Sequence, residues 1–113
     1  MENEAKNILI NARNLLADES NWIKGWFALD ADNNAVVLWG NDAVCWCMTG
    51  AIHRASGYYG FYPTPLTAES LKIAFNILGT VIPNDKSVST FNDSPTTTHA
   101  MVLEAFDKAI ATL

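Results

Sequence analysis

Residues 43–55 have the sequence Ala-Val-Cys-Trp-Cys-Met-Thr-Gly-Ala-Ile-His-Arg-Ala, which is apolar nearly all round until the His-Arg pair near its end. A helix with this profile is surrounded by protein on most sides. An Asn-Asp pair stands just before it and supplies an N-cap. We therefore predict a central buried α-helix over Ala43–Ala55. Gly50 lies on its small-residue edge, where a neighbouring helix can approach closely, so Gly50→Leu is expected to cost about 1–3 kcal/mol by overpacking.

Three further segments have apolar residues at three- and four-residue steps, the pattern of amphipathic helices. They are Glu4–Ala17, Ala68–Leu78 with Thr67 as its cap, and a last helix that runs from an N-cap at Ser94 to the C-terminus. Between the last two, residues 80–92 are predicted to be irregular, with one short extended stretch near Val88.

A β-hairpin is predicted before the central helix. Two short apolar or aromatic runs, 22–29 and 35–39, flank the Asp/Asn-rich tip Asp30–Asn34. Asn and Asp tolerate the left-handed backbone that such tips require. A lone hairpin is marginal in water, so this one is expected to lie against the helices with its aromatic side chains.

Length and composition indicate one globular domain over residues 1–113. The chain is 50% hydrophobic and only 17% charged, which is enough apolar surface to form one core. The predicted fold class is mainly α (α+β): about four helices around a central apolar helix, with one small β-hairpin.

Charge argues against one class of partner. The net charge is −5 and the seven basic residues are scattered singly, whereas phosphate contacts need clustered Lys and Arg, so nucleic-acid binding through a basic surface is not expected. An acidic group could instead fit a basic groove on another protein, or simply keep the protein soluble. Its members are Asp18, Glu19, Asp30 and Asp32.

The location is expected to be cytoplasmic. No apolar run approaches the ~20 residues that a membrane span needs. The first residues, Met1-Glu2-Asn3-Glu4, have neither the basic start nor the apolar segment of a secretory signal.

The order of these features resembles a family of short uncharacterised proteins from bacteria and their phages. The matching residues are the Trp-rich hairpin, Cys45-Trp46-Cys47, Gly50-Ala51, and Asn92-Asp93-Ser94-Pro95 with Thr98. Where that family has an acidic residue three positions after the threonine, this chain has Met101, so a capping box is incomplete. The resemblance implies a fold and a domain of unknown function, and it brings no activity, cofactor or catalytic residue.

Cys45 and Cys47 are the first candidates for chemistry. On a helix, residues two apart point about 200° from each other, so the thiols could share neither a metal ion nor a disulfide. If 43–48 were a strand, both sulfurs would share a face and a Cys₂His₂ site with His53 and His99 would become conceivable. Buried free cysteines in a reducing compartment are the simpler interpretation.

The remaining polar candidates give no catalytic arrangement. On a helix, Cys45 and His53 would lie about 12 Å apart, too far for a nucleophilic dyad. Asp85, Asp93 and Glu104 show no acid/base spacing, and Asp93 is expected to bond its own turn. No glycine-rich phosphate loop is present. We therefore assign no catalytic, metal or cofactor-binding residue.

An aromatic loop is the least ordinary feature. Tyr58, Tyr59, Phe61 and Tyr62 fall within five residues, and Trp22 and Trp26 occur earlier. Clustered Tyr and Trp suit a protein interface or a stacking floor for a nucleotide; a lid that closes the core is the structural alternative. Together with Asp30 and Asp32, these residues form the candidate interface.

The leading functional hypothesis is a small non-enzymatic protein-binding domain. A phage or mobile-element inhibitor of a host defence system, such as an anti-CRISPR, is one form of it, and that form is implied only by the resemblance. The alternatives are a small-molecule or nucleotide binder with an aromatic pocket and, third, a cysteine or metal-dependent enzyme.

Overall fold

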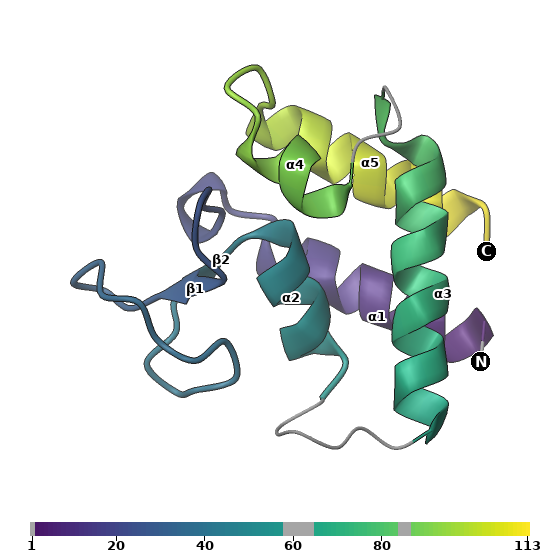
Figure 1. The fold of residues 1–113 in the computed structure, drawn as a ribbon, viewed down its shortest axis with the longest axis horizontal. Coiled ribbons are helices and arrows are strands. Elements are labelled where there is room, and N and C mark those ends of the chain that lie inside the picture. Colours follow the sequence, from purple (N-terminus) through teal and green to yellow (C-terminus); the bar gives the residue numbers. More distant parts are fainter. Residues whose placement is uncertain (1, 58–64, 84–86) are drawn as a thin grey trace.

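The computed structural model describes residues 2–57, 65–83 and 87–113, and Figure 1 shows the elements found there. Two short strands, β1 (Ala28–Leu29) and β2 (Cys45–Trp46), pair as an antiparallel sheet. The helices are α1 (Glu2–Leu15), the short 3₁₀ helix η1 (Glu19–Asn21), α2 (Met48–Ala55), α3 (Pro65–Val81), α4 (Val88–Asp93) and α5 (His99–Ala111). The protein is mainly α with one small antiparallel sheet, as the sequence predicts.

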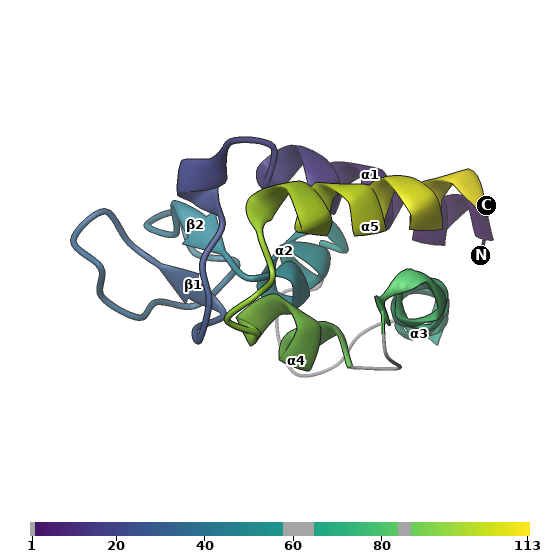
Figure 2. The ribbon, with the colours of Figure 1, turned by 90° about the horizontal axis from the view of Figure 1, so that it is seen from above.

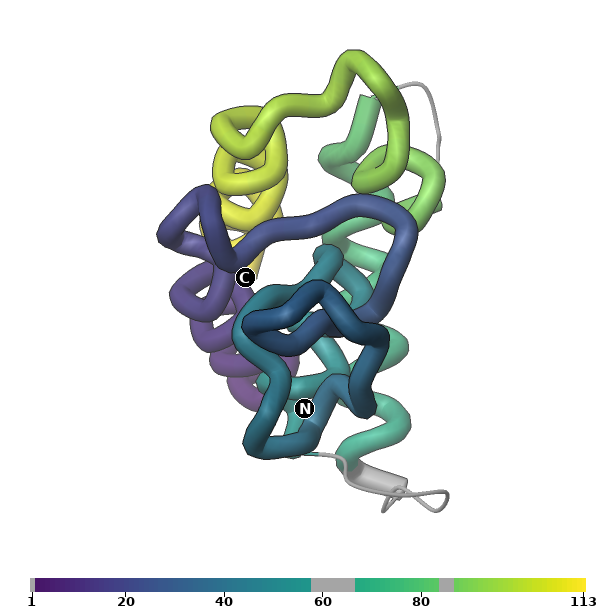
Figure 3. Tube along the Cα trace, turned by 90° about the vertical axis from the view of Figure 1, so that its left-hand side faces the viewer, coloured from purple at the N-terminus to yellow at the C-terminus, as the bar shows by residue number. Residues whose placement is uncertain are grey.

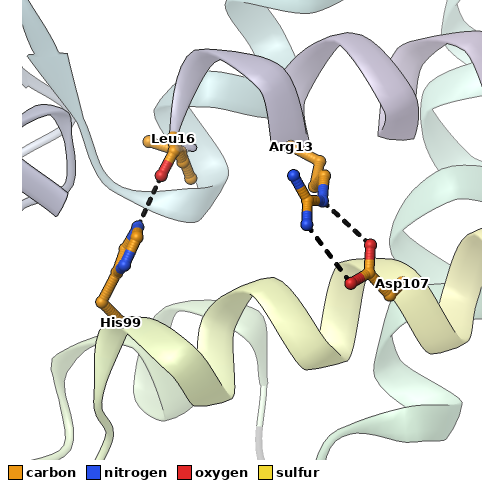
Figure 4. Close-up of polar contacts among 4 residues, drawn as sticks. All are labelled: Arg13, Leu16, His99 and Asp107. Atoms are coloured by element: carbon orange, nitrogen blue, oxygen red, sulfur yellow. Dashed lines mark hydrogen bonds and ion pairs between the residues drawn. The ribbon is translucent and has the colours of Figure 1, made fainter. Parts of the chain in front are cut away.

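The first and last helices lie side by side, with both chain ends on the side of the molecule away from the sheet (Figures 1 and 2). Arg13 of α1 donates two hydrogen bonds to Asp107 of α5, at 2.9 and 3.4 Å, and the two form an ion pair (Figure 4). About one turn further along the chain, just after α1 ends, the Leu16 carbonyl oxygen lies 2.6 Å from the ring of His99, the first residue of α5 (Figure 4). Because a carbonyl only accepts, Nε2 of His99 must carry the proton in this bond.

The core lies around α2, which packs between α1 and α4, while α3 packs against α1 and α5 (Figure 2). Met48 and Ile52 of α2 are completely buried, and each contributes about 1.5–3 kcal/mol to the free energy of unfolding by its removal from water. The other completely buried apolar residues are Ala5, Leu9, Ala12, Leu16, Ala51, Ala74, Leu78, Val102, Phe106 and Ala109.

The amphipathic helices form where their apolar stripes place them, with shifted ends. The first extends over Glu2–Leu15 and the third over Pro65–Val81. The prediction for the last helix is wrong at its start, because Thr98 and not Ser94 is its N-cap and accepts a hydrogen bond from the Met101 amide at 3.2 Å. The cap therefore forms without the acidic residue of a capping box.

The prediction of irregular chain over residues 80–92 is also wrong in part. Val88–Asp93 forms α4, a short helix capped by the Ser87 hydroxyl, which accepts from the Thr90 amide at 3.1 Å. The first residues of the same stretch belong to the end of α3. The predicted extended stretch near Val88 is thus helical.

The prediction of a helix over the whole of Ala43–Ala55 is wrong for its first five residues. Cys45 and Trp46 form β2, Cys47 is the N-cap, and the helix begins only at Met48. An apolar run has no periodicity that separates a buried strand from a buried helix. The pairing with β1 decides the outcome, and it joins residues far apart in the sequence. From Met48 on, the predicted interior helix is present.

The predicted hairpin keeps its tip but changes its partner strand. Asn33 has a φ of +65°, and Asp30 accepts hydrogen bonds from the Asn34 amide at 2.8 Å and the Asp32 amide at 2.9 Å. A single antiparallel bridge, Leu29 to Ala35, closes the tip. The regular pairing of β1, however, is with β2 and not with the predicted run 35–39.

Gly50 does allow a close backbone contact, as predicted. The neighbouring chain is the segment at Phe27, however, and not another helix. A Cβ atom added at this position would lie 3.0 Å from the carbonyl carbon and 3.3 Å from the Cα of Phe27, and would overlap the Phe27 carbonyl oxygen. The chain just before β1 therefore packs directly onto α2, which is possible because Gly50 has no side chain.

Candidate interaction surface

Exposed apolar side chains are concentrated in one part of the molecule, residues 25–44, which we call the lobe. It holds β1 and the loops on either side of the Asp30–Asn34 tip, and it projects at the left in Figure 1 and towards the viewer in Figure 3. In the described part of the chain, every large hydrophobic residue that is exposed belongs to the lobe: Trp26, Phe27, Val37, Trp39 and Val44. Trp26 and Phe27 are the most exposed, at 59% and 60%.

The backbone before Trp26 is anchored by the buried amide of Asn92, at the end of α4. Its Oδ1 accepts from the Trp22 indole at 2.7 Å and from the Met48 backbone amide at 3.0 Å. Its Nδ2 donates to the Ile23 carbonyl at 3.0 Å and to Asp93 at 2.9 Å. All the bonding capacity of this side chain is used, so it fixes the segment that leads to Trp26 against α4 and α2.

A second anchor is the Asp93 carboxylate. Its Oδ1 accepts from the Gly25 backbone amide at 2.9 Å as well as from Asn92. Gly25 itself has a φ of +85°, a conformation that glycine adopts without steric cost. The prediction that Asp93 bonds its own turn is wrong for this oxygen, which accepts from Gly25, 68 positions away in the sequence.

Lys24, the residue before Gly25, makes a further contact with the turn after α4. Lys24 Nζ donates to the Ser94 carbonyl at 2.7 Å and lies 5.4 Å from the centroid of the Trp22 ring, within cation–π range. Side chains from both partners thus make this contact: Trp22 and Lys24 from the segment before Phe27, and Asn92 and Asp93 from α4.

The other loop of the lobe has its own clamp. Arg54 of α2 donates to the carbonyl oxygens of Leu38 at 3.2 Å and Gly40 at 2.9 Å, and its guanidinium stacks 5.6 Å from the Trp46 ring. The Trp46 indole donates to the same Leu38 carbonyl at 3.0 Å. This loop carries Trp39, which is exposed.

A cavity of about 230 Å³ lies between the lobe and α4. One wall is Gly25, Trp26 and Phe27, and the other is contributed by α4 through Ser89, Asn92 and Asp93. Cys47 also lines it. The cavity therefore joins two exposed aromatic residues to one carboxylate.

The two cysteines are free and buried. Burial raises the pKa of both thiols above the ordinary value, although Cys47 stands at a helix N-terminus and accepts from the Gly50 amide at 3.3 Å. A raised pKa disfavours the thiolate that attacks substrates or binds metals. Although the chain at Cys45 is extended, the described residues contain no cluster of three or more His, Cys, Asp or Glu that could hold a metal ion.

The histidine of α2 is held among apolar groups. The His53 ring lies 5.6 Å from the Phe75 ring of α3, and burial lowers the pKa of His53 below its ordinary value. A lowered pKa favours the neutral form of the ring.

The predicted interface residues fall into three groups. Trp26 and Asp32 are exposed, while Asp30 is half-buried and holds the tip, where the Asn34 amide lowers the pKa of its carboxyl. Trp22 is turned to Asn92 and contributes to the core boundary. The aromatic loop with Tyr58, Tyr59, Phe61 and Tyr62 lies outside the described residues.

The sequence analysis did not identify the anchors, and of the five exposed large hydrophobic residues in the described chain it selected only Trp26. Phe27 and Val37 belong to the two apolar runs of the predicted hairpin, and Val44 to the predicted central helix, so none of them was selected as an exposed residue. Asn92 was identified only as part of a turn motif, and its polar neighbours Asp93 and Ser94 give no local signal that its amide is buried. Nothing in the sequence pairs Asn92 with Trp22.

Fold and surface together define a small, mainly helical domain whose exposed large apolar residues, within the described chain, gather in one lobe. The family comparison agrees with the resemblance noted above: the chain belongs to a family of unknown function (DUF6197), whose model matches residues 1–112. No curated protein and no solved structure matches the chain. Among the described residues, no helix combines the length and the apolar character needed to cross a bilayer.

Proposed function

We propose that the chain is a small non-enzymatic domain that binds another protein through the lobe. One observation carries this proposal: the adjacent residues Trp26 and Phe27 are the most exposed large apolar side chains described, yet their backbone is tied to α2 and α4. Aromatic residues are enriched at the centres of protein interfaces, where burial of a large ring contributes most. A rigid backbone also lowers the entropy lost on binding.

The test is quantitative capture from host lysate with the double variant Trp26→Ala/Phe27→Ala. We expect the variant to keep the far-UV circular dichroism and urea midpoint of the wild type and to lose the partner. Leu103→Ala is the control, because Leu103 is a partly exposed apolar residue of α5, outside the lobe. Equal capture by the double variant and the wild type would contradict the proposal.

Capture of a small molecule is a second candidate, and the cavity beside Trp26 supports it. A volume of about 230 Å³ suits only a small ligand or one side chain. Asp93 also lines the cavity, and a carboxylate repels phosphate groups, so a nucleotide is disfavoured there. A cysteine-based activity is less supported, because burial raises the pKa of Cys47.

A role as an inhibitor of a host defence system in the cytoplasm of a bacterial cell is a narrower form of the same proposal. It rests on the resemblance of the sequence to bacterial and phage proteins. The acidic balance of the chain, with a net charge of −5, favours partners with a basic surface.

A further inference from the structure

We infer that the cavity between the lobe and α4 takes the basic side chain of a partner protein, an arginine or a lysine. This inference rests on the proposed function and specifies the chemistry of the partner. The observation behind it is the meeting of Trp26, Phe27 and the Asp93 carboxylate around a single cavity.

The Asp93 carboxylate uses only one of its two oxygens in hydrogen bonds with the described residues. Asp93 Oδ1 accepts from the Gly25 amide and from Asn92 Nδ2, both at 2.9 Å. Within the described residues, no hydrogen bond of the protein reaches Oδ2. The two bonds to Oδ1 hold that oxygen in place, and Oδ2 of this exposed carboxylate keeps its capacity to accept from an incoming donor. A charge-assisted bond from a guanidinium or ammonium is among the stronger bonds such an oxygen can accept.

Trp26 and Phe27 form the aromatic wall of the cavity. Indole and phenyl faces attract cations through their negative π surface, and a cation held between such a face and a carboxylate gains from both. The same chemistry already operates within this fold, where Lys24 lies over the Trp22 ring and donates to the Ser94 carbonyl. That lysine is occupied there and does not line the cavity.

The surroundings of the cavity favour a cation that is carried on a peptide chain. A second, more open hollow of about 470 Å³ adjoins the cavity and shares Ser89 and Asp93 with it. Thr90 and Pro95 line this hollow, so the site continues beyond the volume of one side chain along α4 and the turn after it. A free small cation would use only the inner cavity. A peptide chain fills both, with its basic side chain inside and its backbone along the hollow.

The test uses two blocked pentapeptides, acetyl-Gly-Gly-Arg-Gly-Gly-amide and its citrulline analogue, which has nearly the same shape and no charge. Binding to the full chain is followed by ¹H–¹⁵N NMR at the Gly25 and Asp93 amides and the Trp26 indole, with the Trp39 indole as an internal control. We expect saturable shifts at the first three signals with the arginine peptide, and affinity at least about fivefold weaker for citrulline.

Asp93→Asn is the decisive variant. It keeps an Oδ1 that can accept both existing bonds and replaces the free oxygen with an amide, so we expect binding about five- to tenfold weaker with the fold retained. If this variant fails to fold, Trp26→Ala provides the same test from the exposed aromatic side. Equal affinity for citrulline, unchanged binding by both variants, or tighter binding of free agmatine than of the peptide would each overturn the inference.

The outcome separates this inference from the proposed function. If Trp26→Ala/Phe27→Ala loses its partner in lysate while the arginine peptide does not bind, the lobe is an interface and the basic-side-chain inference is wrong. If the peptide binds and Asp93→Asn weakens it as expected, but lysate capture is unchanged by the double variant, the cavity recognises a basic side chain and the proposed docking of a protein on the lobe is wrong.

Discussion

Replacing Gly50 with alanine should destabilise the fold, although alanine is the better helix former. In a helix interior, Gly→Ala gains about 0.5–1 kcal/mol because it restricts the unfolded chain. Here the new Cβ would overlap the Phe27 carbonyl oxygen and stand 3.0 Å from the carbonyl carbon. A Cβ cannot rotate away from its own backbone and its neighbours are backbone atoms of Phe27, so relief requires α2 and the chain before β1 to separate. Overpacking of this kind costs about 1–3 kcal/mol, and we expect the upper half of that range to prevail over the propensity gain.

The assay is urea unfolding followed by tryptophan fluorescence, with Gly79→Ala as the matched control. Gly79 lies in α3, and a Cβ added there meets nothing within 4 Å. The control should therefore raise the free energy of unfolding by about 0.5–1 kcal/mol, while Gly50→Ala lowers it by about 1–2 kcal/mol at an unchanged m-value. If both variants are stabilised alike, the close contact between α2 and Phe27 does not exist.

Three further predictions follow from the anchors and the charged groups. Asn92→Ala should lower the free energy of unfolding by about 2–4 kcal/mol, because two buried N–H groups lose their acceptor, whereas the exposed Asn76→Ala should change it by less than about 0.5 kcal/mol; equal urea midpoints would contradict this. Burial lowers the pKa of His53, so the contribution of the neutral ring to the free energy of unfolding is fully present above the ordinary pKa of about 6.5 and is lost as the pH falls towards the folded-state pKa. Between about pH 7.5 and 5.5 the urea midpoint of the wild type should therefore fall further than that of His53→Gln. Parallel curves would refute the burial argument. The ion pair of Arg13 and Asp107, whose side chains are 32% and 56% exposed, should show a coupling energy below about 1 kcal/mol in a double-mutant cycle that decreases with added salt, and a larger or salt-independent coupling would show that solvent does not screen it.

The helices with a clean apolar stripe could be predicted from the sequence because a period of 3.6 residues is a local signal. The ends of α1 and α3 shift by a few residues, which is the ordinary uncertainty of terminal turns. The short helix α4 could not be found in this way. It has only six residues, and its N-cap at Ser87 is its only strong local signal.

The strand at Cys45 was named only as the alternative to a helix, because the sequence could not decide between the two. Residues buried on every side show no period, and the pairing of β2 with β1 rests on contacts between distant segments. The same is true of the anchors at the candidate surface. Trp26 could be selected by its residue type, but the chain before it is held by Asn92 and Asp93, which bond Trp22 and Gly25 from 70 and 68 positions away.

The chain is held on either side of Trp26 and Phe27, and these contacts explain why the two rings stay exposed. Before them, Asn92 and Asp93 fix the backbone through side-chain bonds; after them, the Phe27 carbonyl rests against Gly50 and accepts from the Cys47 amide at 3.4 Å. A loop free to move would gain stability by turning two large rings inward, at about 1.5–3 kcal/mol for each apolar side chain buried. The anchors prevent that collapse. Single exposed apolar residues are ordinary on protein surfaces, whereas a group of them on a fixed backbone is typical of a binding surface. The fold of this chain keeps such a group in place, and loss of the Asn92 and Asp93 bonds or of the contact at Gly50 should therefore impair the proposed binding through the lobe even where Trp26 and Phe27 are themselves unchanged.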